Sequence, residues 1–303
     1  MIGIEEGDDA AVYRLSDNMA LIQTVDFFTP IVDEPYDFGV IAAINAMNDV
    51  FTMGGSVKLA LNICGFPDTL DPAVVSEILA GGSDAVAAEG GTLVGGHTIE
   101  CVDPIYGLSV TGIVDPKRLL TKHGSNAGDL LILTKSLGTG AITTALKNRA
   151  VSPESLAQAV LSMKRSSSKI AGILADIGAT ACTDVTGFGL VGHTLELFSR
   201  VPLGARIKFD GLNLLPGARE AIVDGHLPGG ESRNRRCFRT HVTLPADAPD
   251  WLESLIYTPE TSGGLLISVP EEMGHEAIER IGDSAPEASI IGQIVEEPGV
   301  RLE

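Results

Sequence analysis

The chain lacks the features that mark a secreted, membrane-bound or nucleic-acid-binding protein. Its apolar runs fall well short of the ~18 residues that a membrane helix needs. Its first ten residues carry four acids and no base, unlike a signal or transit peptide. With 40 acidic residues against 21 Lys and Arg, the formal net charge is −19, which repels nucleic-acid phosphates and anionic membranes. We therefore expect a cytoplasmic protein that has neither nucleic acid nor a membrane as partner.

Cysteine pairs and the familiar nucleotide loops are also missing. The four cysteines show neither CxxC nor metal-ligand spacing, so we expect small buried hydrophobic residues without chemistry; they are Cys64, Cys101, Cys182 and Cys237. No G-x-x-x-x-G-K-[ST] loop occurs, and Gly138-Thr139-Gly140 lacks the later glycine of a dinucleotide loop. If the protein binds a nucleotide, it does so by other means.

The apolar pattern predicts an α/β protein, and 303 residues favour two domains over one. A first series of elements is followed by a loose segment over 115–128, which we take as a linker. In the first series we predict strands at 10–15, 19–28, 57–66, 92–94 and 106–114, with helices at 36–53 and 72–88. In the second we predict strands at 129–134, 205–209, 265–269 and 288–295, and helices within 153–175 and at 189–200 and 271–281.

Aspartates at the ends of apolar segments are the first candidate site. They are Asp8 and Asp9 before the first strand, Asp26 near the end of the second, Asp49 in the last turns of the first helix, and Asp184 in a polar turn before a later helix. Each alone fits a cap or turn residue. An acid near a helix C-terminus is disfavoured by the helix dipole, however, and converging carboxylates repel each other. Magnesium relieves both effects and bridges carboxylates to phosphates, so the pattern predicts an acidic site that holds a nucleotide through metal.

Two glycine-rich segments, Val94–Thr98 and Thr261–Gly264, are predicted as turns. Such turns let the backbone approach a ligand and present N–H groups to phosphate, although ordinary tight turns have the same composition. The basic cluster of Arg233, Arg235, Arg236 and Arg239 is predicted to be a salt-bridged surface. Anion capture or a subunit contact is the alternative, and we leave the cluster out of the site.

Taken in order, eight segments resemble the selenophosphate synthetases (selenide, water dikinases) of the aminoimidazole ribonucleotide synthetase superfamily. They are GDDAAVY (7–13), TVDFFTPIVDEPYDFG (24–39), NAMNDVFTMGG (45–55), LVGGHTIE (93–100), YGLSVTGIV (106–114), TDVTGFGLVGH (183–193), LPGG (227–230) and TPETSGGLL (258–266). The first motif alone is shared across the superfamily. The third, sixth and eighth segments together point to the selenium branch.

The resemblance implies a fold, a reaction and a set of site residues. The reaction is ATP + selenide + water → selenophosphate + AMP + phosphate, and ATP and Mg²⁺ are the implied substrate and cofactor. The implied magnesium ligands are Asp9, Asp49 and Asp184; the implied nucleotide contacts are Glu6, Gly7, Asp8, Asp26, Asp49, Gly96, His97 and Thr98. The implied fold has an ATP-binding and dimerisation domain at 1–117, pairing into a barrel across a homodimer, and a C-terminal α/β layer domain at 127–303.

One departure concerns the family's catalytic Cys or selenocysteine and the Lys three residues after it. Both precede the GDDAAVY motif, and here Met1 lies only a few residues before that motif. We therefore expect this chain to bind Mg·ATP and to form little selenophosphate. Either the reading frame begins too late, as when a selenocysteine UGA codon is taken for a stop, or the chain is a non-catalytic Mg·ATP-binding dimer. Another kinase or synthetase of the superfamily is the remaining alternative.

Overall fold

The computed structural model describes residues 1–303, which divide into two compact units. The first unit comprises Met1–Leu119 together with Met163–Gly172. The second comprises Leu120–Ser162 and Ile173–Glu303. The ten residues 163–172 thus belong to the first unit although they lie within the second half of the chain. None of the helices combines the length and apolar character needed to cross a bilayer.

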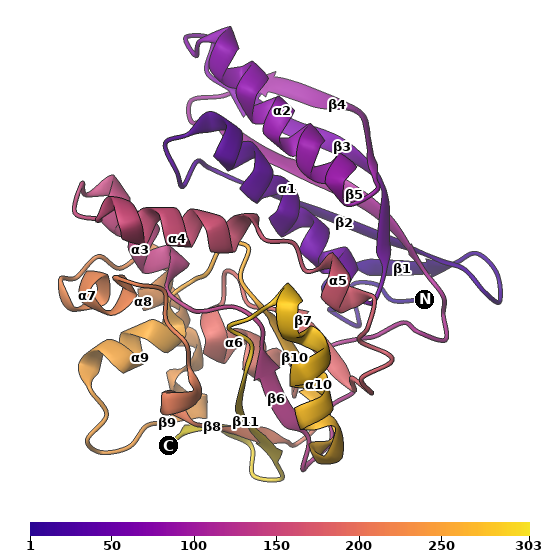
Figure 1. Ribbon diagram of the computed structural model, residues 1–303, viewed down its shortest axis with the longest axis vertical. Helices are drawn as coiled ribbons and strands as arrows, with labels where there is room; N and C mark the ends of the chain where they lie inside the picture. Colours follow the sequence, from indigo (N-terminus) through magenta and orange to yellow (C-terminus); the bar gives the residue numbers. More distant parts are fainter. The chain divides into compact units, whose positions relative to one another are not determined.

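The first unit is built on a five-stranded sheet with helices on one face (Figure 1). Its strands are β1 (Ala11–Arg14), β2 (Ala20–Phe28), β3 (Ser56–Phe66), β4 (Thr92–Glu100) and β5 (Ile105–Val114), in the order β1-β2-β5-β3-β4. All neighbours are antiparallel except the parallel pair β3–β4. The helices are α1 (Pro35–Thr52), α2 (Pro72–Ala88) and the short α5 (Ser168–Ala171).

The two long helices begin and end where the sequence predicted. Pro35 occupies the first turn of α1, and Gly54, with φ +71°, ends it. The Asp71 side chain caps α2 by accepting a 2.8 Å hydrogen bond from the Ala73 N–H. The helices also approach each other closely, because a Cβ added at Gly81 would lie 2.1 Å from the carbonyl oxygen of Tyr36. These signals are local, which explains why they could be predicted.

Strand β2 has one face toward the helices and one toward solvent. Ala20, Ile22 and Thr24 are buried, whereas Gln23 and Val25 are exposed. This period of two places the next inward position, Asp26, on the side of the sheet covered by α1. The polar residues Thr24 and Asp26, near the end of this strand, therefore face helix α1.

The second unit contains a seven-stranded sheet in the order β7-β10-β6-β11-β8-β12-β9. Its strands are β6 (Leu130–Leu133), β7 (Ala181–Asp184), β8 (Gly204–Ile207), β9 (Val242–Thr243), β10 (Leu265–Val269), β11 (Ser289–Val295) and β12 (Gly299–Leu302). Only β12 pairs in parallel, with β8 and β9. The helices are α3 (Thr139–Lys147), α4 (Pro153–Lys164), α6 (Gly189–Glu196), α7 (Ala218–Val223), α8 (Gly229–Phe238), α9 (Asp250–Tyr257) and α10 (Gly274–Ile281).

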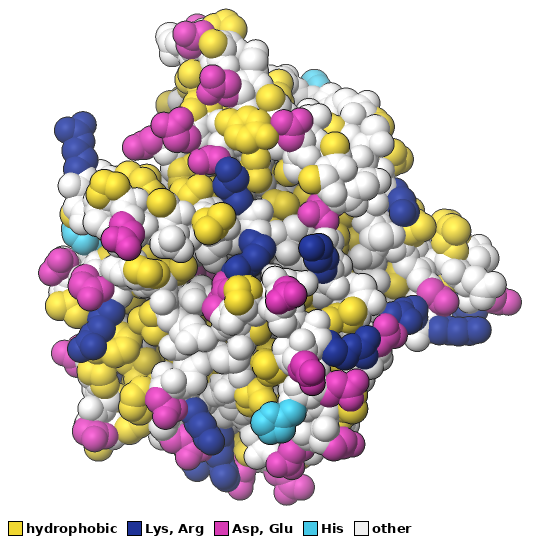
Figure 2. All heavy atoms as spheres, in the orientation of Figure 1, with side chains coloured by type: hydrophobic (Ala, Val, Ile, Leu, Met, Phe, Trp, Pro, Cys, Tyr) yellow, Lys and Arg dark blue, Asp and Glu magenta, His cyan; other side chains and the backbone are white.

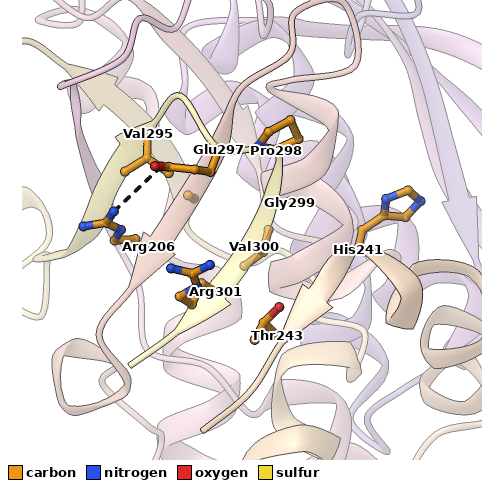
Figure 3. A pocket seen from close by; sticks show the side chains of 10 residues that line it. Arg206, His241, Thr243, Val295, Glu297, Pro298, Gly299, Val300 and Arg301 are labelled. Atoms are coloured by element: carbon orange, nitrogen blue, oxygen red, sulfur yellow. Dashed lines mark ion pairs between the residues drawn. The ribbon is translucent and has the colours of Figure 1, made fainter.

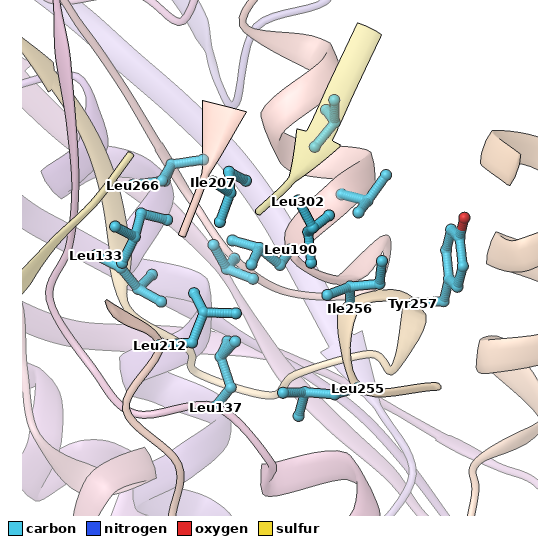
Figure 4. Packing of buried hydrophobic residues seen from close by; sticks show 14 of the residues in the cluster. Leu133, Leu137, Leu190, Ile207, Leu212, Leu255, Ile256, Tyr257, Leu266 and Leu302 are labelled. Atoms are coloured by element: carbon cyan, nitrogen blue, oxygen red, sulfur yellow. The ribbon is translucent and has the colours of Figure 1, made fainter. Parts of the chain in front are cut away.

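One apolar cluster joins this sheet to its helices (Figure 4). Leu133 and Leu266 from the sheet belong to the same buried cluster as Leu190 of α6 and Ile256 of α9. Strand β10 is buried at every position because it pairs with β6 and β7 and is covered on both faces. On the face drawn in Figure 2 the acids are spread among Lys and Arg rather than gathered in one patch.

Several predicted elements were wrong in detail. Strand β4 runs through Glu100, so Val94–Thr98 is an irregular strand segment and not a turn; Gly95 and Gly96 have φ of 140° and 149°. Asp184 is the last residue of strand β7 and does not lie in the turn itself. The helix predicted at 189–200 ends at Glu196. Helices α3, α7, α8 and α9 were not predicted; at six to ten residues each, they depend on tertiary packing.

Helix α3 is capped by a buried carboxylate distant in sequence. The two oxygens of Glu260 accept 2.8 Å hydrogen bonds from the Gly138 and Thr139 N–H groups, and the Thr139 hydroxyl also donates to it. Burial raises the pKa of Glu260 from its usual 4.5 to about 7, and these hydrogen bonds oppose the shift only in part. The Glu260 carboxylate therefore stabilises the start of α3, although its burial disfavours the ionised form.

Replacing Glu260 should change how stability depends on pH. Because the pKa is raised in the folded state, the folded chain holds more protons than the unfolded chain between pH 4.5 and about 7. The free energy of unfolding therefore falls as pH rises through this range. Glu260→Gln should remove this contribution, which denaturant unfolding at several pH values will show. Glu271→Gln, at an exposed position, is the matched control; identical pH slopes in the two variants would contradict the prediction.

Candidate nucleotide and metal site

A polar cluster lies between α1 and β2 in the first unit. The side-chain amide of Asn45 donates to the Oδ2 atom of Asp26, and the hydroxyl of Thr24 donates to Oδ2 of Asp49 at 2.5 Å. Thr24 and Asp26 are two residues apart on one face of β2, and Asn45 and Asp49 are one turn apart on α1. The structure thus places Asp26 and Asp49 in one polar cluster between β2 and α1.

The electrostatics of this cluster favour a cation. Burial raises the pKa of Asp26, while hydrogen bonds from the Phe27 backbone and from Asn45 act in the opposite direction. Beside them on α1, Asn48 is fully buried and neither polar atom of its side chain has a hydrogen-bond partner. Carboxylate and amide oxygens are the ligands that Mg²⁺ prefers. The residues present therefore fit a magnesium ion, although no group of three or more His, Cys, Asp or Glu side chains in residues 1–303 forms a metal-binding arrangement.

The GDD motif forms the turn that leads into β1. The Gly3 N–H donates to the Glu6 carboxylate at 2.7 Å, Gly7 has φ of +63°, and the Asp9 N–H donates to the Asp8 carboxylate at 3.0 Å. The register of β1 with β2 pairs Ala11 with Gln23. The antiparallel direction therefore places Asp9 at the end of β1 that lies nearest Val25 and Asp26.

The predicted contacts Gly96, His97 and Thr98 lie on a different edge of the sheet. They belong to β4, where they pair with Asn62, Ile63 and Cys64 of β3. A Cβ at Gly96 would lie 2.3 Å from the Asn62 carbonyl oxygen, so this close approach requires glycine. Strands β5 and β3 separate β4 from β2, a spacing of about 14 Å at ~4.8 Å per strand. The structure does not bring these three residues next to Asp26 and Asp49 within one chain.

Asp184 belongs to the second unit. It is 4% exposed and pairs with Leu265 of β10. The turn that follows it is tied to other segments: the Val185 N–H donates to the Gly264 carbonyl, and the Glu260 N–H donates to the Thr186 carbonyl, both at 2.9 Å. The TDVTGFG and TPETSGG motifs are therefore one structural feature, with Asp184 at its edge.

Two buried charged residues beside this feature were missed. Glu260 caps α3, and Lys135, 3% exposed, donates from Nζ to the Ser262 carbonyl oxygen at 2.8 Å. Ser262 has a φ of +46°, which is unusual for a residue other than glycine. The available signal was a lysine directly after a buried strand and a glutamate inside a glycine-rich motif, but each also fits an exposed loop residue.

The remaining candidates have plain structural roles. Arg235 forms ion pairs with Glu231 and Glu253, and Arg239 with Glu253, so part of the arginine cluster is a salt-bridged surface as predicted. Cys64 and Cys182 are buried as expected, but Cys101 is partly exposed and Cys237 is exposed, which contradicts the expectation for these two.

A shallow pocket in the second unit contains none of the predicted site residues (Figure 3). Residues of β8, β9 and β12, the loop before β12 and His241 just before β9 line it, among them Arg206 and Arg301. The figure shows Arg206 paired with Glu297, at 3.7 Å. The site predicted from sequence and the pocket are therefore separate features.

Comparison with known proteins agrees with the fold. The family models for the AIR synthase related protein N-terminal and C-terminal domains match residues 7–114 and 126–303. The solved thiamine-monophosphate kinase of Stenotrophomonas maltophilia superposes with a TM-score of 0.75 at 17% identity, covering 100% of this chain and 90% of that one. A HypE structure with ATP gives a TM-score of 0.71 at 18% identity, covering 94% and 79%.

Curated relatives are much closer in sequence. The selenide, water dikinase of Caldanaerobacter subterraneus subsp. tengcongensis is 44% identical over 98% of this chain and 86% of its own length. The enzymes of the same name from Clostridioides difficile and Pelobacter propionicus are 42% and 41% identical, over 97% and 100% of this chain and 85% and 87% of theirs. The chain belongs to the selenide, water dikinase family of AIR synthase related proteins.

Proposed function

We propose that this protein takes part in ATP-dependent synthesis of selenophosphate from selenide and water, with AMP and phosphate as the other products, in the cytoplasm. The observation that carries the proposal is identity above 40% to selenide, water dikinases along nearly the whole chain. The cluster of Asp26 and Asp49 supports it, because two partly buried carboxylates in one polar cluster suit a metal ion that carries an anion.

The site residues divide between metal and nucleotide. Asp9, Asp49 and Asp184 would hold Mg²⁺, which when bound neutralises the triphosphate and links it to the protein. Thr24 fixes the Asp49 carboxylate and Asn45 fixes that of Asp26, so both are oriented before the nucleotide arrives. Asp26 would contact the nucleotide together with Glu6, Gly7 and Asp8, while Gly96, His97 and Thr98 offer an exposed backbone on β4.

Removing the charge of Asp49 should weaken nucleotide binding through the metal. Asp49→Asn preserves the side-chain shape but removes a magnesium ligand charge, and we expect the Kd for Mg·AMPPNP to rise by about 10-fold or more. Isothermal titration calorimetry measures it. EDTA should abolish binding to the unaltered protein.

Asp33→Asn is the matched control, because it makes the same charge change at an exposed position between β2 and α1. It should bind like the unaltered protein. Equal affinity with and without magnesium would exclude the metal role, and equal weakening by both substitutions would show a general charge effect instead of a ligand at Asp49.

Turnover should depend on selenide and on the family's Cys or Sec and Lys ahead of the first motif. We expect protein that carries these residues ahead of the first motif to release AMP and phosphate when selenide is added under anaerobic conditions. Residues 1–303 alone should be slower by about 100-fold or more, as when one electrostatic contact to a transition state is lost. Nucleotide chromatography and phosphorus NMR measure both products.

Two results would contradict this assignment. Turnover stimulated by thiamine monophosphate and not by selenide would indicate another kinase of the superfamily. Tight Mg·ATP binding with no turnover in either chain would indicate a non-catalytic nucleotide-binding protein.

We also propose a homodimer, formed through the open face of the five-stranded sheet. Val25 and Phe27 of β2 and Leu59 and Leu61 of β3 are all about half exposed. Val25 and Leu61 both pair with Ser109 of the intervening β5, so they lie in one row on the face away from α1. Exposed apolar side chains on two strands of one sheet face suit contact with a second copy of the same sheet.

A charge on this face should separate the two copies. Leu61→Arg buries an unpaired cation if the face is an interface, so we expect a monomer at concentrations where the unaltered protein is a dimer, as measured by light scattering after gel filtration. Val223→Arg, on the exposed side of α7, should remain dimeric. A monomeric unaltered protein, or a dimer unaffected by Leu61→Arg, would contradict this interface.

A further inference from the structure

A chain of three charged or titratable side chains, two of them buried, lies beside the turn that follows β7. The Lys122 Nζ atom donates to Oε1 of Glu196 at 3.0 Å, and the other carboxylate oxygen of Glu196 lies 2.9 Å from Nδ1 of His193. Lys122 and His193 are 4% and 6% exposed. Burying any one of these charged or polar groups alone would be energetically unfavourable. Here each group lies against a polar partner, which offsets that cost.

The far end of the chain contacts the turn itself. The Phe188 N–H donates to Nε2 of His193 at 3.3 Å, and the Thr186 hydroxyl lies at the same distance from that nitrogen. A backbone N–H can only donate, so Nε2 accepts and the ring proton resides on Nδ1. Nδ1 lies close to Oε2 of Glu196 without an aligned hydrogen bond, so the carboxylate holds the side of the imidazole that faces away from the turn by proximity.

The charge state of Glu196 agrees with this arrangement. Burial acts to raise the pKa of Glu196, but its contacts with His193 and Lys122 outweigh burial and lower the pKa. The carboxylate, whose side chain is 28% exposed, is thus held ionised. The Phe188 ring also packs against the imidazole, with ring centroids 5.4 Å apart.

Three other contacts restrain the same turn from separate elements. Val185 donates its N–H to Gly264, Thr186 accepts from the Glu260 N–H, and Gly187 accepts from the Asn234 side chain of α8, each at 2.9 Å. Every residue from 185 to 188 is therefore hydrogen-bonded to another segment of the unit, two of them to the segment 260–264. Of these contacts, only the one at Phe188 is made by a titratable side chain, that of His193. His193 in turn lies against Glu196, which is paired with Lys122.

We propose that His193 is a positioning residue for Asp184, acting through the turn at 185–188 and oriented by Glu196 and Lys122. Groups behind a metal ligand that fix its orientation are known to contribute strongly to metal affinity. The inference rests on the proposed role of Asp184 as a magnesium ligand. It adds residues that touch neither metal nor nucleotide.

Two substitutions of His193 with side chains of different length test the hydrogen bond from the Phe188 N–H to Nε2. The side chain of Gln is long enough to place an acceptor near the position of Nε2, whereas that of Asn reaches only the position of Nδ1. We expect His193→Asn to raise the magnesium concentration for half-maximal AMPPNP binding by about 10-fold, and His193→Gln to stay within about 3-fold of the unaltered protein. His275→Asn, at an exposed position, is the control and should have no effect. Melting temperatures are recorded for all variants.

A merely structural role predicts a different pattern. It would lower the melting temperature with both substitutions and would not distinguish Asn from Gln in magnesium dependence. Equal magnesium dependence in the two variants, whether weakened or unchanged, overturns the proposal.

A double-mutant cycle with Asp184 tests whether the effect of His193 passes through that residue. In an Asp184→Asn background, His193→Asn should cause no further change, because its effect passes through Asp184. An undiminished 10-fold effect in that background overturns the positioning role while leaving the function intact. If Asp184→Asn alone leaves magnesium dependence unchanged, the metal role of Asp184 fails, and the inference fails with it for that separate reason.

Discussion

The first unit depends on how carboxylates are buried against an apolar helix. Asp26 follows the inward-facing residues of β2, and desolvation there disfavours its charged form. Asn45 and Thr24 supply hydrogen bonds that hold Asp26 and Asp49 in place, but they add no positive charge. The fold therefore maintains a region of negative potential that a hard cation would relieve. A bound metal ion would also reconcile the net negative charge of the protein with an anionic nucleotide.

The second unit solves a different problem, that of holding a short turn rigidly. The residues after Asp184 have no regular structure of their own, so their backbone groups bond to Gly264, Glu260 and Asn234 and to the imidazole of His193. Buried charges appear wherever such support is needed: Glu260 at the start of α3, Lys135 on the Ser262 carbonyl, and the Glu196 carboxylate. Each is costly to bury alone and is retained where several donors or charges meet it.

Sequence signals were reliable where the cause was local. Pro35, Asp71 and the glycines after α1 and α2 set helix ends through capping and backbone conformation, which involve only neighbouring residues. They failed where pairing decided the outcome. Gly95 and Gly96 have the composition of a turn, yet pairing with β3 keeps them in β4. The residues of β7 form a strand because β10 binds beside them, and α7 to α9 are too short to form without packing.

The same division holds for the site and for the protein as a whole. The sequence by itself determined the family, the acidic character and the identity of the carboxylates, because motifs and charges are properties of the residues alone. Only the tertiary structure decided that Thr24 and Asn45 orient Asp49 and Asp26, that Gly96–Thr98 lie three strands from them, and that His193 supports the turn after Asp184. The contacts of Thr24 and Asn45 join residues 25 and 19 positions apart, and the place of β4 depends on strand order. No local sequence pattern encodes such a distance in space.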